Sequence, residues 1–184
     1  MKELSLNILD IAQNSIKAGA DAISIVLTES EDSLTICITD NGCGMKPDFL
    51  EAVTNPFTTT RTTRKVGLGI PLFKLAAEQT DGSLRITSKH ETEYPDEHGT
   101  VVTATFNTRH MDFTPLGDIA STLTILIQGS PQIHWIYTHT TPWGNISLDT
   151  EELKAVLGDV PLDTFEVIAW ISEYIKEQYS VLKK

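Results

Sequence analysis

Basic residues, cysteines and long apolar runs are all scarce in this sequence. It has 14 lysines and arginines against 25 aspartates and glutamates, a formal net charge of −11, which disfavours broad contact with nucleic acid or anionic membrane. Its two cysteines, Cys37 and Cys43, have no histidine spaced to complete a zinc or iron–sulfur site. No stretch approaches the roughly 20 apolar residues of a membrane span, and no signal peptide opens the chain. We therefore expect a cytoplasmic protein with reduced thiols that binds neither nucleic acid nor membrane.

Two common phosphate-binding motifs are also missing. The sequence contains no GxxxxGK[ST] motif, which excludes a P-loop. The GxGxxG fingerprint of dinucleotide-binding proteins is incomplete, because Leu72 stands where the third glycine would follow Gly67 and Gly69. Any phosphate site in this chain must therefore use another arrangement.

Hydrophobic periodicity predicts alternating helices and strands in the first 107 residues. Apolar residues recur at helical spacing over 3–17, and apolar and polar residues alternate over 22–27 and 34–39. The same patterns predict a short helix over 48–54, a helix over 70–80, and strands over 83–88 and 100–106. Residues 55–66 are rich in threonine and arginine and indicate a loop.

The composition changes after residue 107. Residues 108–115 have the character of a linker, and residues 116–184 predict a helix over 118–128, a strand over 133–138 and two further helices. Asp149 and Asp163 are each followed three residues later by a glutamate, which is typical of helix N-termini. We expect a first domain over 1–107, a linker over 108–115, and a small C-terminal α/β unit over 116–184 that docks a partner.

Two glycine-rich boxes follow a helix that carries a carboxylate and an amide. The boxes are Asp40-Asn41-Gly42-Cys43-Gly44-Met45, after an apolar strand, and Val66-Gly67-Leu68-Gly69-Ile70, before a helix. Asp10 and Asn14 lie one turn apart on the first helix and face the same way. Glycines let the backbone approach a ligand closely, and the free N–H groups at a helix start can bind phosphate oxygens. Each box alone also occurs in ordinary turns.

In this order, the helix and the two boxes resemble the Bergerat ATP-binding fold of the GHKL superfamily. That superfamily includes type II topoisomerases, heat-shock chaperones, histidine kinases, mismatch-repair ATPases and anti-sigma-factor kinases. The resemblance implies an α/β protein of the α+β two-layer type, with a mixed sheet covered by helices on one face. It also implies that the chain binds ATP with Mg²⁺.

The resemblance implies a role for each matching residue. Asn14 would bind Mg²⁺ through its amide oxygen, a ligand that this ion accepts. Asp40 would accept the N6 amino proton of adenine, and Thr100, in His98-Gly99-Thr100, would support Asp40. Lys17 would contact the phosphates; the alternative is a solvated charge at the end of the helix. The other residues implied to contact the nucleotide are Gly42, Gly44, Met45, Arg64, Lys65, Gly67, Leu68 and Gly69.

Asp10 stands where hydrolysing members of the superfamily carry a glutamate that acts as general base. Aspartate is shorter by one methylene group and the geometry of a base is strict, so we expect slow hydrolysis. The alternative is a surface carboxylate without a catalytic role. Residues 58–65 would form a lid over the nucleotide, with Arg61, Arg64 and Lys65 closing on the triphosphate; a solvated loop is the alternative.

Three functions stay open at this stage. The five histidines lie in predicted loops, strands or the linker, and only two residues precede the first helix, so we expect no phosphoacceptor histidine domain. The first function is a protein kinase that phosphorylates a separate partner. The second is a slow regulatory ATPase whose lid and dimer state report the nucleotide, and a homodimer is left open. The third is a non-catalytic nucleotide-binding regulator or sensor.

Overall fold

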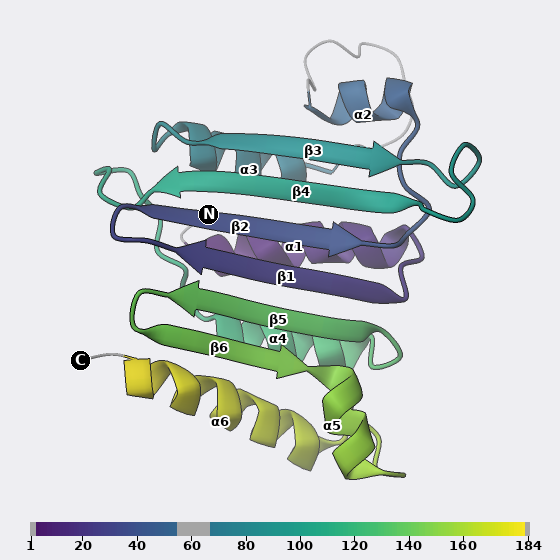
Figure 1. Ribbon diagram of the computed structural model, residues 1–184, viewed down its shortest axis with the longest axis vertical. Helices are drawn as coiled ribbons and strands as arrows, with labels where there is room; N and C mark the ends of the chain where they lie inside the picture. Colours follow the sequence, from purple (N-terminus) through teal and green to yellow (C-terminus); the bar gives the residue numbers. More distant parts are fainter. Residues whose placement is uncertain (1–2, 55–66, 183–184) are drawn as a thin grey trace.

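The protein is built on one mixed sheet of six strands, in the order β3-β4-β2-β1-β5-β6. The computed structural model describes residues 3–54 and 67–182. Its elements are α1 (Leu4–Lys17), β1 (Ala22–Glu29), β2 (Ser33–Asp40), α2 (Pro47–Thr54), α3 (Gly69–Glu78), β3 (Ser83–Lys89), β4 (Gly99–Asn107), α4 (Ile119–Gly129), β5 (His134–Thr141), β6 (Gly144–Asp149), α5 (Thr150–Leu157) and α6 (Phe165–Leu182). Helices α1, α3 and α4 lie behind the sheet, and α6 runs beside β6 (Figure 1). The expected two-layer α+β fold is confirmed.

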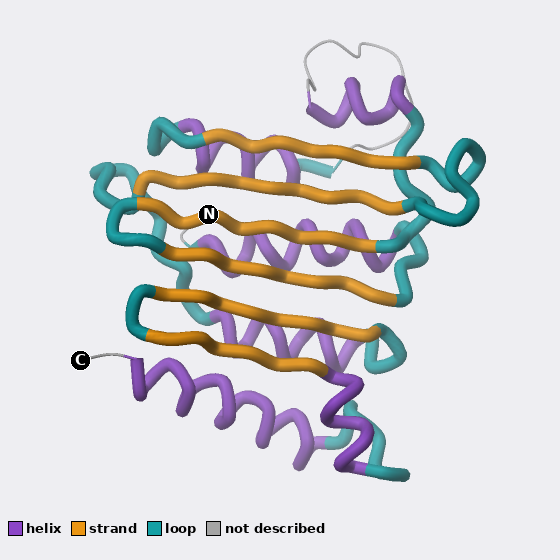
Figure 2. Tube along the Cα trace, viewed as in Figure 1, coloured by secondary structure: helices purple, strands orange, loops and turns teal. Residues whose placement is uncertain are grey.

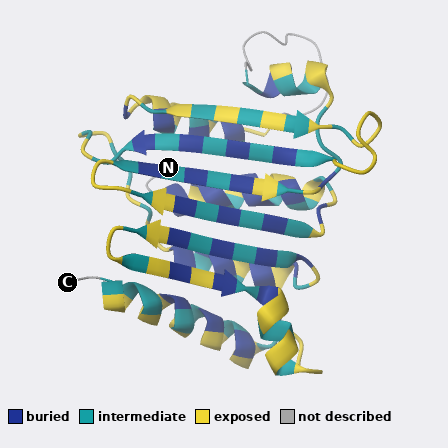
Figure 3. Ribbon diagram, viewed as in Figure 1, coloured by how far each residue is buried: buried dark blue, intermediate teal, exposed yellow. Residues whose placement is uncertain are grey.

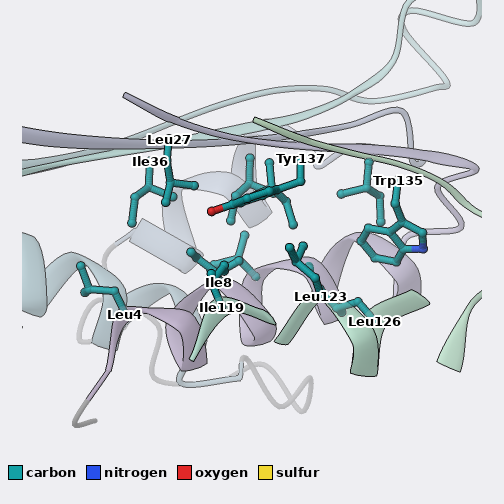
Figure 4. Packing of buried hydrophobic residues seen from close by; sticks show 14 of the residues in the cluster. Leu4, Ile8, Leu27, Ile36, Ile119, Leu123, Leu126, Trp135 and Tyr137 are labelled. Atoms are coloured by element: carbon teal, nitrogen blue, oxygen red, sulfur yellow. The ribbon is translucent and has the colours of Figure 1, made fainter. Parts of the chain in front are cut away.

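The core forms between this helical layer and one face of the sheet. Helix α1 buries Leu4, Ile8 and Ile11 at helical spacing, and strands β1 and β2 each bury every second residue. The close view in Figure 4 shows Leu4 and Ile8 of α1 below Leu27 and Ile36 of the sheet. The periodicities of the sequence therefore place the helices and strands in the same layers that the structure has.

Residues 116–184, which we expected to form a separate unit, extend this sheet. Strand β5 pairs with β1 in parallel, with Ile23 opposite Trp135. Trp135 and Tyr137 are fully buried on the face that carries the helices, and Leu123 and Leu126 of α4 lie beneath them (Figure 4). One continuous cluster of buried side chains includes residues from both segments. The two segments thus share a sheet and a core.

The predicted linker over 108–115 ends against the first turn of α1. The backbone N–H groups of Leu4 and Ser5 donate to the carbonyl oxygens of Pro115 and Leu116, at 2.9 and 2.8 Å. No side chain caps this helix, so these carbonyls satisfy two of the N–H groups that a helix start leaves without partners. The linker is therefore part of the packed structure at the point where it enters the C-terminal segment.

Strand β6 was not predicted from the sequence. It is short, and only Ile146 and Leu148 are buried along it. Gln178 of α6 protects its outer edge: the side chain accepts from Ser147 N and donates to Ser147 O, both at 3.2 Å. These two bonds replace those that a further strand would make, which removes the exposed backbone groups of an edge strand at this point.

The other predicted elements are present, with ends that differ by a few residues (Figure 2). The predicted cap of α5 is confirmed, because the Asp149 side chain accepts from Glu151 N at 2.9 Å. The predicted loop over 55–66 lies outside the described residues. Among the described helices, none is long and apolar enough to cross a membrane.

A hydrogen-bonded network of polar side chains lies at the edge of the core, between β1, β5 and α6. His139 Nε2 lies 3.0 Å from Glu29 Oε2, and His139 Nδ1 lies 2.7 Å from the hydroxyl of Tyr179. The Tyr179 hydroxyl lies 2.5 Å from that of Tyr137. A carboxylate only accepts, so Nε2–H donates to Glu29, and the neutral ring then accepts from Tyr179, which accepts from Tyr137. Each of these four side chains has a hydrogen-bond partner when His139 is neutral.

Stability is expected to fall as the pH drops below about 6.5, the ordinary histidine value. Burial lowers the pKa of His139, against the opposing effect of Glu29. The unfolded chain then binds a proton more readily than the folded one, so the stabilisation is complete above the unfolded pKa and is lost as the pH falls through the folded pKa. Urea unfolding at pH 7.5 and pH 5.5 measures this loss, with a slope of at most about 1.4 kcal/mol per pH unit from this histidine.

The control for this prediction is a pair of substitutions. His139→Gln should remove the steeper part of the pH dependence between pH 7.5 and 5.5, whereas His90→Gln should leave it unchanged, since His90 sits in a surface loop. An equal pH dependence in the wild type and His139→Gln would show that His139 does not titrate differently in the folded state.

Candidate nucleotide-binding site

Helix α1 presents Asp10 and Asn14 to the start of α3. Both side chains are exposed on α1 and lie one turn apart. A Cβ placed on Gly69, the first residue of α3, would lie 3.2 Å from the Cβ of Asp10 and 3.9 Å from Asn14 Nδ2. The structure thus brings together three of the residues predicted from separate motifs. A larger residue at position 69 would press on the carboxylate-bearing helix, which explains the glycine there.

The carboxylate of Asp40 is held in place at the end of β2. Its Oδ2 accepts from the hydroxyl of Ser15, at 2.5 Å, and its Oδ1 accepts from Gly42 N, at 2.9 Å. Ser15 directly follows Asn14, so α1 contacts both the first glycine box and the start of α3. Each carboxylate oxygen can accept more than one hydrogen bond, and Asp40 can therefore accept a hydrogen bond from a ligand without losing its two partners.

The first glycine box packs closely against its neighbours. A Cβ on Gly42 would lie 2.8 Å from Ala18 Cβ, and a Cβ on Gly44, where φ is +73°, would lie 2.0 Å from Lys89 O. Cys43 N donates to Ala18 O at 2.9 Å. These glycines are required because the loop passes between the end of α1 and the end of β3 with no room for a side chain.

Thr100 lies opposite Asp40 in the pairing of β2 with β4, on the same buried face of the sheet. Its hydroxyl lies 2.8 Å from Ser88 Oγ, and Ser88 Oγ accepts from Met45 N at 2.7 Å. We expected the Thr100 hydroxyl to support Asp40. The hydroxyl that bonds Asp40 is that of Ser15, and Thr100 instead fixes the far side of the glycine box through Ser88.

Helix α3 begins at the second glycine box. Its N-cap is Leu68, whose side chain makes no capping hydrogen bond and is 69% exposed. A Cβ on Gly67 would meet no atom within 4 Å. The positive end of the α3 dipole therefore lies beside Asp10 and Asn14, and within residues 3–54 and 67–182 no side chain caps it, which is an arrangement that accepts an anion.

The remaining predicted residues are more distant or outside the described chain. Lys17 is exposed in the last turn of α1, one turn beyond Asn14. Arg64 and Lys65, together with the predicted lid over 58–65, lie outside the described residues. Within residues 3–54 and 67–182 no three His, Cys, Asp or Glu side chains cluster as a metal site. A metal ion here would take Asn14 and oxygen atoms of its nucleotide as ligands, which suits Mg²⁺.

Sequence reasoning missed the roles of Ser15 and Ser88. Ser15 is buried among the apolar residues on one face of α1. A polar residue on an apolar stripe needs a hydrogen-bond partner, and that signal could have linked it to Asp40. Ser88 gave no such signal, because serine is common near the end of a strand.

Three comparisons with known proteins agree with this geometry. Residues 2–110 match the family described as "Histidine kinase-, DNA gyrase B-, and HSP90-like ATPase". The chain belongs to this family. Among curated proteins, it is 23% identical over 113 residues to an NtrY-like sensor histidine kinase from Rickettsia conorii, which covers 61% of this chain and 18% of the relative.

Among solved structures, the fold resembles the N-terminal domain of a DNA repair protein, with a TM-score of 0.53, 19% identity, and coverage of 81% of this chain and 52% of the other. It also resembles the MutL ATPase domain of Aquifex aeolicus in complex with ADP, with a TM-score of 0.50, 12% identity, and coverage of 85% and 69%. The chain thus has the histidine-kinase-like ATPase fold, and it spans less than a fifth of the sensor kinase that it matches.

Proposed function

We propose that this protein binds Mg²⁺-ATP and transfers its γ-phosphate to a residue of a separate partner protein. The observation that carries the proposal is the double contact of α1. Through Ser15 it holds Asp40, the predicted adenine ligand, and through Asp10 and Asn14 it faces Gly69 at the start of α3. A nucleotide that lies along α1 would place its adenine at Asp40 and its phosphates at the start of α3. The family supports ATP as this nucleotide.

Each residue then has a defined task. Asp40 accepts a hydrogen bond from the N6 amino group of adenine, and the N–H groups at the start of α3 bind phosphate oxygens. Asn14 is the protein ligand of Mg²⁺, which neutralises charge on the phosphates when bound. Lys17, Arg64 and Lys65 add positive charge around the triphosphate. Because phosphoryl transfer depends mainly on positioning and charge, these tasks suffice once an acceptor is in place.

A separate partner is proposed because this chain offers no suitable histidine acceptor. All five histidines lie in described residues, and each lies in a strand, a turn or a loop rather than on a helix.

We also propose a cytoplasmic location, because the two free thiols, Cys37 and Cys43, suit a reducing compartment.

A slow ATPase is the second candidate. It is favoured by Asp10, whose carboxylate-bearing side chain extends beside Asn14 and Gly69, next to the proposed phosphate site. Following the γ-phosphate of labelled ATP with the purified protein distinguishes the two. Release of free phosphate supports the ATPase, whereas intact bound ATP supports a partner-dependent kinase or a non-catalytic regulator. Failure to bind ATP at all would overturn both, as well as the alternative of a nucleotide-binding regulator.

Asn14→Ala is expected to remove the effect of Mg²⁺ on ATP affinity. In the wild type, replacing Mg²⁺ with EDTA should weaken ATP binding about 10-fold, or about 1.4 kcal/mol, because the metal no longer neutralises charge on the phosphates. In Asn14→Ala the two conditions should give nearly equal affinities, measured by titration calorimetry. Gln13→Ala, on the neighbouring position of α1, is the control and should keep the full metal effect. A Mg²⁺ effect of wild-type size in Asn14→Ala would remove Asn14 from this role.

A further inference from the structure

A groove with exposed apolar walls lies between α5 and α6 and shares no residue with the proposed nucleotide site. It has a volume of about 360 Å³ and is lined by Leu153, Val156, Leu157, Glu166, Val167 and Trp170. We call these six residues the α5–α6 groove. Val156 is 86% exposed and Trp170 is 50% exposed, and Phe165, at the start of α6, is 82% exposed. Figure 3 shows that most of α5 and the outer side of α6 are open to solvent.

The aromatic wall of the groove is a stacked pair of rings. Trp170 stacks on Tyr174, one turn later in α6, with ring centroids 4.9 Å apart and planes at 12°. A tryptophan that is already held in one orientation loses little entropy when it is buried by a partner, and exposed tryptophans of this kind are frequent anchors of interfaces. Val167 is buried and forms the floor.

One acidic residue, Glu166, lines the groove, and the segment that forms α5 and the first half of α6 is acidic. Residues 150–174 contain six acidic residues and one lysine, Lys154. Lys154 is already engaged, since its Nζ lies 3.0 Å from Glu151 Oε1. A second copy of this chain would place the same acidic rim against itself, and like charges at an interface oppose association. A partner with lysines and arginines around its apolar residues would instead be attracted.

We propose that the α5–α6 groove binds a basic amphipathic helix of a partner protein. The apolar residues of that helix, at i and i+4 spacing, would enter between Val156 and Trp170, and its basic residues would face the acidic rim. The proposal goes beyond the proposed function, which requires a partner but assigns no surface to it.

The position of the groove supports a functional link with the nucleotide site. Strand β6 ends at Asp149, directly before α5, and Asp149 lies in one row across the sheet with Ile136, Ser24 and Thr39. Thr39 precedes Asp40, so three strand spacings, about 14 Å, separate the start of α5 from the proposed adenine ligand. In Figure 1, α5 and the Asp40 end of β2 lie at the same end of the sheet. A partner held on α5 and α6 is therefore at the end where ATP would bind.

The test uses a synthetic 18-residue peptide with leucines at helical spacing on one face and lysines elsewhere. A second peptide has glutamate in place of lysine, and a third has the first composition in scrambled order. We expect the first peptide to bind the full protein, measured by fluorescence anisotropy at physiological salt, and the other two to bind at least about 10-fold more weakly. Equal binding of the scrambled peptide would overturn the proposal, since it would reflect net charge alone.

Variants of the protein locate the site. Trp170→Ala and Val156→Ser should each weaken peptide binding about 10-fold or more. Trp143→Ala, which removes a tryptophan that is 65% exposed in the turn between β5 and β6, should leave it unchanged. Equal losses in all three variants, or no loss in the first two, would overturn the proposal.

Two further measurements separate this proposal from its alternatives. Asp40→Asn should bind the peptide like the wild type, so failure at the nucleotide site and failure at the groove are distinguishable. In sedimentation of the protein alone, Val156→Ser should have the same oligomeric state as the wild type. A dimer that this substitution breaks would make a second copy the occupant and would overturn the choice of a basic helix.

Discussion

Replacing Asp40 with asparagine is expected to lower ATP affinity about 10- to 100-fold, the usual effect of losing a hydrogen bond to a charged group. It should also reduce the preference for ATP over GTP. A carboxylate only accepts and so selects the N6 amino group of adenine, whereas an asparagine amide can also donate to the O6 carbonyl of guanine. Calorimetric titration with both nucleotides measures affinity and preference together.

Two observations make this substitution interpretable. An asparagine oxygen can still accept from Gly42 N, which Asp40 Oδ1 does in the wild type, so the loop need not move. Asp32→Asn, in the exposed turn before β2, removes a carboxylate beyond the other end of the strand and should change neither affinity nor preference. Unchanged ATP affinity in folded Asp40→Asn would place the adenine site elsewhere.

Sequence reasoning predicted the helices and strands whose apolar residues repeat at a short, regular spacing. The amphipathic face of α1 and the alternation of β1 and β2 repeat every few residues, so burial can be read from the order of side chains alone. The same holds for Asp40 and Gly69, whose boxes stand at the end of a strand and the start of a helix. Their proximity to α1 then follows from the sheet and its helical layer.

The joining of residues 116–184 to the sheet could not be read in this way. Strands β1 and β5 pair in parallel but are separated by β2, β3, β4 and three helices, so no hairpin or turn signals their pairing. Strand β6 has too few apolar residues to stand out from a loop. It is placed by its pairing with β5, and its outer edge is bonded by Gln178, which comes from α6.

The site shows the same division. Asp10, Asn14, Asp40 and Gly69 carry recognisable patterns, whereas the positioning groups are ordinary serines. Ser15 holds Asp40 and Ser88 holds Met45 N only because three strands and one helix meet there. Such roles depend on tertiary neighbours, which a single sequence does not list.

Asp10→Asn is expected to reduce any release of phosphate from ATP by at least about 100-fold, the usual contribution of a general base. If Asp10 is the general base, it takes the proton of the water that attacks the γ-phosphorus as the bond to the ADP oxygen breaks. Asparagine keeps the size of the side chain but cannot take that proton. ATP affinity should change little, because Asn14 and the start of α3 remain in place. Phosphate release and ATP binding are measured on the same preparation.

The comparison of the two activities decides the role of Asp10. Asp112→Asn, an exposed carboxylate in the segment between β4 and α4, is the control and should hydrolyse ATP like the wild type. If phosphate release in Asp10→Asn equals that of the wild type while binding is intact, Asp10 is a surface carboxylate and not a base. If binding falls with hydrolysis, the Asp10 carboxylate contributes to ATP binding itself, because asparagine keeps the contact that the Asp10 Cβ makes with Gly69.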